Sequence, residues 1–173
     1  MKTFVEIGAC DFNNLTHLVQ HNWKGVIVEP ITKYFDNIPK VDNIYYVNAA
    51  IADSNGFATM YTAHDDVVAE DYDFAGMSSF YKGSWVLTEE VEVPTMTLDK
   101  LFSITNVTEI DYLKIDVEGY DFELLKMFPW DRITPKLIKF ESKHIDIDAA
   151  IELLESKGYH CEDEGENTFA IKL

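Results

Sequence analysis

Short apolar runs alternate along the chain with stretches in which apolar residues recur every three or four positions. The first pattern predicts buried β-strands and the second predicts amphipathic helices. Strands are expected at 4–7, 26–29, 44–48, 110–116 and 136–141, and helices around 15–19, 31–38, 97–102, 119–125 and 147–157. Because helices separate successive strands, we expect parallel pairing through right-handed crossovers, as in a doubly wound α/β sheet.

Two further strand pairs depart from this alternation. Residues 57–62 and 86–93 should pair as a ribbon beside the sheet, and 159–163 and 168–173 should form a hairpin that supplies its last two strands. Between the strands of the ribbon, residues 63–85 carry five carboxylates and a cluster of aromatics. A loop of this length in a small domain favours a lid over a substrate. We therefore expect a single domain over 1–173 with a lid or insert at 63–85.

The end of the first strand carries the most informative chemistry. The run Phe4 to Asp11 leads into a turn at Gly8, and the second apolar strand ends on Glu29, which Pro30 follows. A carboxylate at the end of the second strand is typical of sites that bind the ribose hydroxyls of a nucleoside. The sequence therefore predicts a cofactor that contains a nucleoside.

Charge narrows the choice of cofactor. A dinucleotide fold needs several glycines against a pyrophosphate, whereas this turn has only Gly8 and carries Glu6 and Asp11. Two carboxylates repel a phosphate but suit a sulfonium and an ammonium group. The turn therefore favours S-adenosylmethionine as the cofactor. It argues against a nicotinamide dinucleotide, and so against a nicotinamide-dependent oxidoreductase.

Composition restricts the location and the partners. The chain has 173 residues, of which 47% are apolar, and its net charge is −17. A nucleic-acid duplex or an anionic membrane surface would be repelled, so neither is expected as a partner. We expect a soluble, cytoplasmic protein, because no long apolar run occurs and the first strand leaves no room for a signal peptide. Cys10 and Cys161 are too few for a disulfide framework or a zinc site.

The chain resembles a known family in four segments that follow one another in the family's order. They are residues 4–11, 28–30, 48–51 and 113–120. The chain resembles the FkbM-type methyltransferase family over residues 3–142, most specifically at Lys114 to Gly119 with Thr97 to Asp99 before it. The resemblance implies a class I methyltransferase fold, a Rossmann-like three-layer sandwich with a mostly parallel seven-stranded sheet whose last strand is antiparallel. It also implies S-adenosylmethionine as methyl donor, and usually O-methylation of a hydroxyl on a sugar or another small molecule.

The resemblance also implies roles for individual residues. The methionine half of the cofactor would be held by Glu6, Gly8, Ala9 and Asp11, the ribose by Glu29, and the adenine by Ala50 and Ile51. Asp116 would face the methyl-transfer site. Family members often have asparagine and glycine where this chain has Cys10 and Phe12, and helices before the first strand. These departures favour the alternative, a non-catalytic S-adenosylmethionine-binding scaffold or sensor module, and make a homodimer plausible.

Methyl transfer to a hydroxyl needs a base near the strand ends. His144, just past the fifth strand, is the first candidate, and His64, at the start of the acidic loop, is the second. Imidazole titrates near pH ~6.5, so either side chain would be partly neutral at working pH. Asp116 completes the set of candidate catalytic residues.

Lysines within central strands require partners. Lys114 and Asp116 should share one face of their strand, as should Lys139 and Glu141, with Glu118 able to bridge them. The sequence thus suggests a charge network that orients Asp116 and Glu141, and the alternative is that the lysines extend to solvent. We expect no metal, although Asp116 and Glu141 end adjacent strands and their oxygens would suit magnesium or calcium.

Overall fold

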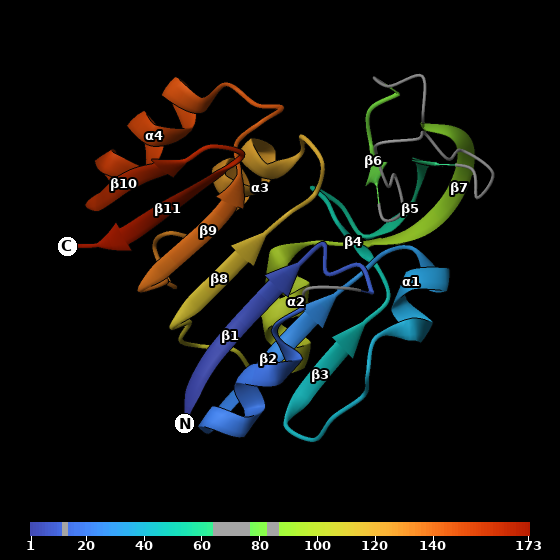
Figure 1. Cartoon of the computed structure of the whole chain (residues 1–173), viewed down its shortest axis with the longest axis horizontal. Coiled ribbons are helices and arrows are strands. Elements are labelled where there is room, and N and C mark those ends of the chain that lie inside the picture. The colour runs from blue at the N-terminus through green and yellow to red at the C-terminus, as the bar shows by residue number, and fades with distance from the viewer. Residues whose placement is uncertain (12–13, 64–76, 83–86) are drawn as a thin grey trace.

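The computed structural model describes residues 1–11, 14–63, 77–82 and 87–173, and these residues form two sheets (Figure 1). The large sheet has seven strands. In spatial order they are β10 (Tyr159–Glu164), β11 (Asn167–Lys172), β9 (Leu137–Glu141), β8 (Tyr112–Ile115), β1 (Lys2–Ile7), β2 (Trp23–Val28) and β3 (Ile44–Val47).

Six strands of the large sheet run in the same direction: the five from β9 through β8, β1 and β2 to β3, and also β10. The last strand, β11, is antiparallel to both β9 and β10. The predicted α/β class with a mostly parallel seven-stranded sheet and an antiparallel last strand is therefore confirmed. The register aligns Ile7 with both Val28 and Ile115, so the carboxyl ends of three central strands lie level with one another.

Helices cover the two faces of the large sheet unequally. One face packs against α2 (Leu98–Thr105), α3 (Asp121–Met127) and α4 (Ile147–Ser156), and the main apolar core lies between them. The other face carries a smaller core, in which Phe4 and Ile27 of the strands meet Leu15 of the 3-10 helix η1 (Leu15–His21). The helix α1 (Thr32–Asn37) places Tyr34 in a third cluster with residues of the small sheet.

The small sheet contains four strands and lies beyond the carboxyl ends of the parallel strands (Figure 1). In spatial order they are β4 (Ala50–Ile51), β7 (Leu87–Met96), β5 (Gly56–Ala63) and β6 (Ser78–Ser79). The antiparallel pair of β5 and β7 is the ribbon expected from the sequence, with Phe57 opposite Pro94. Of the expected lid at 63–85, the structure describes Ala63 and residues 77–82; the remainder, including His64, lies outside the described residues.

Local sequence explains where the elements begin. Asp146 caps α4 by accepting a hydrogen bond from the Ala149 amide, as its place before a helical pattern indicates. The helix α3 begins later than expected, at Asp121, because Glu118 and Gly119 both take left-handed backbone angles, with φ of 52° and 94°. Among the described residues, no helix has the length and apolar character needed to cross a membrane.

Candidate functional site

The ends of β1, β2 and β8 meet at Gly8. The amides of Gly8 and Ala9 both donate to the Val28 carbonyl, at 3.0 and 3.2 Å, so the turn closes directly over the end of β2. Gly8 has φ of 81°, and a Cβ there would lie 1.7 Å from the Asp116 carbonyl oxygen. Only glycine fits this contact, which leaves bare backbone at the edge where doubly wound sheets bind ligands.

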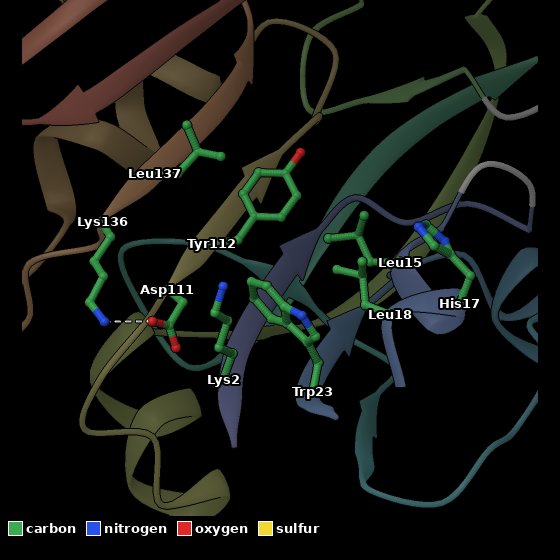
Figure 2. Close-up of a pocket in the computed structure, with 9 residues that line it drawn as sticks. All are labelled: Lys2, Leu15, His17, Leu18, Trp23, Asp111, Tyr112, Lys136 and Leu137. Carbon is green, nitrogen blue, oxygen red and sulfur yellow. Dashed lines mark hydrogen bonds and ion pairs between the residues drawn. The ribbon is translucent and has the colours of Figure 1, made fainter. Parts of the chain in front are cut away.

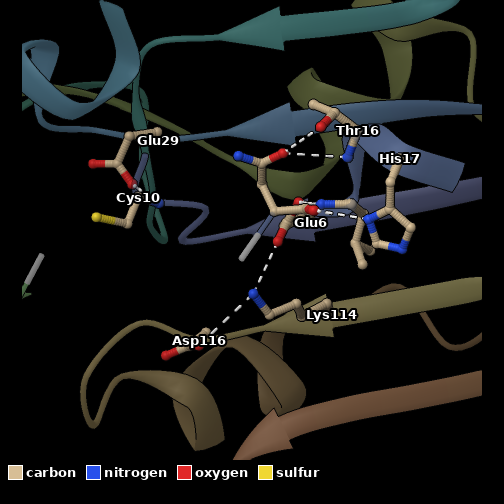
Figure 3. A network of polar contacts seen from close by, with 9 residues as sticks. Glu6, Cys10, Thr16, His17, Glu29, Lys114 and Asp116 are labelled. Atoms are coloured by element: carbon tan, nitrogen blue, oxygen red, sulfur yellow. Dashed lines mark hydrogen bonds and ion pairs between the residues drawn. The ribbon is translucent and has the colours of Figure 1, made fainter. Parts of the chain in front are cut away.

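Glu29 is fixed beside this turn (Figure 3). Its side chain is buried, and its two carboxyl oxygens accept hydrogen bonds from the amides of Cys10 and Ile31, each at 2.8 Å. The Asn48 side chain donates to the backbone carbonyls of Glu29 and Pro30, which ties β3 to the same corner. Each carboxyl oxygen keeps a further lone pair, so Glu29 can still accept hydrogen bonds from a ligand.

Burial raises the pKa of Glu29 from 4.5 to about 7, and the charges of Asp11 and Glu6 act in the same direction. The folded state therefore holds this proton at pH values where the unfolded chain has lost it, so stability should fall as pH rises from about 4.5 to about 7. We expect this group to lower the free energy of unfolding by about 3 kcal/mol over that range. Urea denaturation at several pH values measures this effect. The free energy of unfolding should depend less steeply on pH in Glu29→Gln than in the wild type, and an equal pH dependence in the two proteins would contradict the expectation.

Lys114 lies between two acidic groups (Figure 3). Its ammonium is 2.9 Å from Glu6 Oε1 and 3.9 Å from Asp116 Oδ2, and Glu6 Oε2 accepts from the Leu15 amide at 2.8 Å. Glu6 is completely buried, and burial raises its pKa against the lowering effect of Lys114. The charge network suggested by the sequence is thus present around Lys114, and it holds Asp116 at the strand end.

The second half of that network differs from the expectation. Lys139 Nζ lies 5.8 Å from the centre of the Phe169 ring, and in the described part of the chain no ion pair joins Lys139 to Glu141. The physical reason is that Lys114 has a buried partner on the neighbouring strand β1, whereas Lys139 is partly exposed and keeps contact with solvent.

A narrow cavity is lined by three of the expected cofactor residues. Gly8, Ala50 and Ile51 line it together with Phe80 and Tyr120, whose rings meet edge to face at 4.9 Å between centroids. The aromatic pair was not selected from the sequence, although Phe80 belongs to the aromatic cluster of the expected lid and Tyr120 follows the Lys114 to Gly119 motif. Distance in sequence hides this pair, because β6 brings residue 80 to the turn after β8 through the bond from Ser79 Oγ to the Glu118 carbonyl, at 2.7 Å.

The other candidate residues lie around the same edge. Asp11 accepts a hydrogen bond from the Asn37 side chain at 3.1 Å and is partly exposed. His144 is exposed in the loop after β9, and its Cβ would be 3.4 Å from a Cβ built on Gly119. The structure therefore brings most predicted residues to one edge, with Glu6 buried beneath it. No finding tests their roles, which stay predictions.

A second hollow lies at the opposite, amino-terminal end of the large sheet (Figure 2). Lys2, Trp23, Tyr112 and Leu137 line it, and each stands at the start of its strand or beside it. Parallel α/β sheets bind ligands at the carboxyl ends of their strands, so this hollow is not the candidate site.

Comparisons with known proteins point to one family and fold. A family model described as the methyltransferase FkbM domain matches residues 6–161. Among solved structures, the chain is similar to precorrin-6y C5,15-methyltransferase from Geobacter metallireducens GS-15, with a TM-score of 0.54 and 14% identity over 99% of this chain and 80% of that chain. It also matches a chain of the fibrillarin/Nop5p complex, with a TM-score of 0.49 and 13% identity over 99% of this chain and 73% of that chain. A search of curated protein sequences found no match.

Proposed function

The chain belongs to the FkbM methyltransferase family, and on that premise we propose that it transfers a methyl group from S-adenosylmethionine to a hydroxyl of a small molecule or sugar. The family model spans 6–161, and the sheet has the strand order and single antiparallel strand of class I methyltransferases. The observation that carries the proposal is the buried Glu29 carboxyl beside the bare backbone of Gly8.

The residues at this edge fit the proposed cofactor in three respects. Glu29 has free lone pairs for two ribose hydroxyls, since the amides of Cys10 and Ile31 use one on each oxygen. Small buried residues, Ala49 and Ala50, lie at the predicted adenine position, and Phe80 and Tyr120, which line the same narrow cavity as Ala50, offer aromatic contacts to a flat ring. The negative charge of Asp11 and Asp116 suits a sulfonium and an ammonium group.

The bound donor would supply an electrophilic methyl carbon. As the acceptor oxygen took that methyl group from sulfur, which would keep the electron pair of the broken bond, the hydroxyl proton would have to pass to a base of this chain. Asp116 and His144 are the described candidates for this base. Burial raises the pKa of Asp116, whereas Lys114 and Lys139 lower it, so its carboxylate is a stronger base than a solvent-exposed one.

Methyl transfer can be tested directly with isotopically labelled donor and a panel of hydroxylated sugars and phenols. We expect one methyl ether for each S-adenosylhomocysteine released, and a loss of about 100-fold or more in turnover for Asp116→Asn. The matched control is Asp148→Asn, which changes an exposed aspartate on α4 and should leave turnover unchanged. Cofactor binding without transfer to any acceptor would favour the alternative of a non-catalytic scaffold or sensor module.

A further inference from the structure

Three potential metal ligands converge beyond the ends of β8 and β9. One carboxylate oxygen of Glu118, one of Glu141 and a ring nitrogen of His144 all lie within 4.8 Å of one another. Opposite ligands of a magnesium-sized ion are separated by about 4.2 Å, because each bond is about 2.1 Å long. Small side-chain rotations would therefore bring all three atoms to bonding distance of one ion.

The backbone explains why these residues meet. The strands β8 and β9 are parallel neighbours, with Ile115 opposite Phe140, so both chains leave the sheet at the same edge. The left-handed turn at Glu118 and Gly119 then brings the first loop near the second, so that a Cβ built on Gly119 would lie 3.4 Å from the His144 Cβ. Glycine suits this turn because its φ of 94° is an angle that other residues rarely adopt.

Acidic side chains gather at this corner. Asp116 lies near enough for its charge to act on both Glu118 and Glu141, and Asp121 acts on Glu141. The opposite charge of Lys143 also acts on Glu118 and Glu141, but its ammonium is paired with Glu166 at 2.6 Å. A cation bound here would offset the repulsion that the fold builds in.

Two buried carboxyl oxygens at this corner have no hydrogen-bond partner within the part of the chain that the structure describes. They are Oε2 of Glu141, a residue of the ligand set, and Oδ1 of Asp121, whose side chain has 0% exposure. Asp121 lies near enough for its charge to raise the pKa of Glu141. Unpartnered buried oxygens are rare in native proteins and indicate a missing positive or donating group.

We propose that Glu118, Glu141 and His144 bind one divalent cation, of the Mn²⁺ type, at the acceptor side of the methyl-transfer site. Two carboxylate oxygens and one imidazole nitrogen suit a first-row divalent ion and leave coordination positions open. This step rests on the proposed function: the open coordination positions would bind two neighbouring oxygens of the acceptor, such as those of a vicinal diol in a sugar. The sequence suggested Asp116 beside Glu141 as ligands; the structure gathers Glu118 and His144 around Glu141, which leaves Asp116 as the base.

The cation site can be tested without donor or acceptor, by calorimetry and by electron paramagnetic resonance with Mn²⁺ as probe. We expect one Mn²⁺ per chain, and a dissociation constant raised by about 10-fold or more in Glu141→Gln and in His144→Ala. Glu152→Gln, on the exposed face of α4, should bind as the wild type does. The His144 variant changes an exposed side chain, so it separates loss of binding from loss of folding.

The outcomes separate this inference from the proposed function. Binding that is absent at millimolar Mn²⁺, or equal in all variants, would overturn the cation site. Binding lost in Glu141→Gln and retained in Glu29→Gln would support it even if no acceptor were methylated. Conversely, methyl transfer that persists in full after chelation would reject the metal while leaving the proposed function intact.

Discussion

Replacing Lys114 with methionine should lower the free energy of unfolding by about 3–5 kcal/mol. The ammonium is 2.9 Å from Glu6, whose side chain has no exposed surface, so its removal leaves a buried carboxylate without a counter-charge. Among the described residues, the Leu15 amide would then be the remaining hydrogen-bond donor to that carboxyl group. Denaturant unfolding monitored by circular dichroism would measure the loss.

The chain offers a matched control on the neighbouring strand. Lys139 pairs in register with Lys114 on the same face, but it is partly exposed, and within the described residues it forms no ion pair with a fully buried carboxylate. We expect Lys139→Met to change stability by less than about 1 kcal/mol. The double variant Glu6→Gln and Lys114→Met should recover much of the loss, because it removes the unpaired charge. Unchanged stability in Lys114→Met would show that the network contributes nothing.

Gly8→Ala should destabilise the fold by about 3 kcal/mol or more and abolish cofactor binding. The added methyl group would stand 1.7 Å from the Asp116 carbonyl oxygen and 2.7 Å from its carbon, both of which are backbone atoms. The contact can be relieved only by separating the ends of β1 and β8. That movement would displace the turn that lies beside Glu29. Thermal unfolding and calorimetry with S-adenosylhomocysteine would measure the two losses.

Gly165 provides the control for backbone conformation. It has the same φ of 81° in the hairpin between β10 and β11, but nothing lies within 4 Å of a Cβ built there. Gly165→Ala should therefore cost only the penalty for a left-handed alanine, about 1 kcal/mol. Equal losses in the two variants would show that the contact between Gly8 and Asp116 has no separate effect.

Much of this fold could be predicted because its strands are short, apolar and separated by helical patterns. The two strand pairs outside that alternation were also predictable, since Gly165 marks the turn of the hairpin and the strands of the ribbon show their own apolar patterns. The 3-10 geometry of η1 was not, because 3-10 and α-helices bury apolar residues at similar spacings. The late start of α3 depends on two left-handed residues, of which Glu118 gives no sequence signal.

Part of the candidate site could also be predicted from the strand pattern. Residues at strand ends, such as Gly8, Glu29 and Asp116, follow from the pattern, because parallel strands place their carboxyl ends together. Contacts between loops do not follow from it. The approach of His144 to Glu118, and of Phe80 to Tyr120, depends on how turns fold back after the strands end. The partner of Lys114 was missed because Glu6 lies 108 residues away on another strand.

The central claim is that the ends of β1 and β2 bind S-adenosylmethionine through Glu29. Calorimetric titration of S-adenosylmethionine into the wild type, Glu29→Ala and the exposed-face control Glu155→Ala tests it most directly. We predict one site per chain, with affinity reduced about 100-fold in Glu29→Ala, since hydrogen bonds to a charged group contribute about 1.5–3 kcal/mol each. The control should bind like the wild type. Absence of binding to the wild type, or equal binding to all three proteins, would contradict the account.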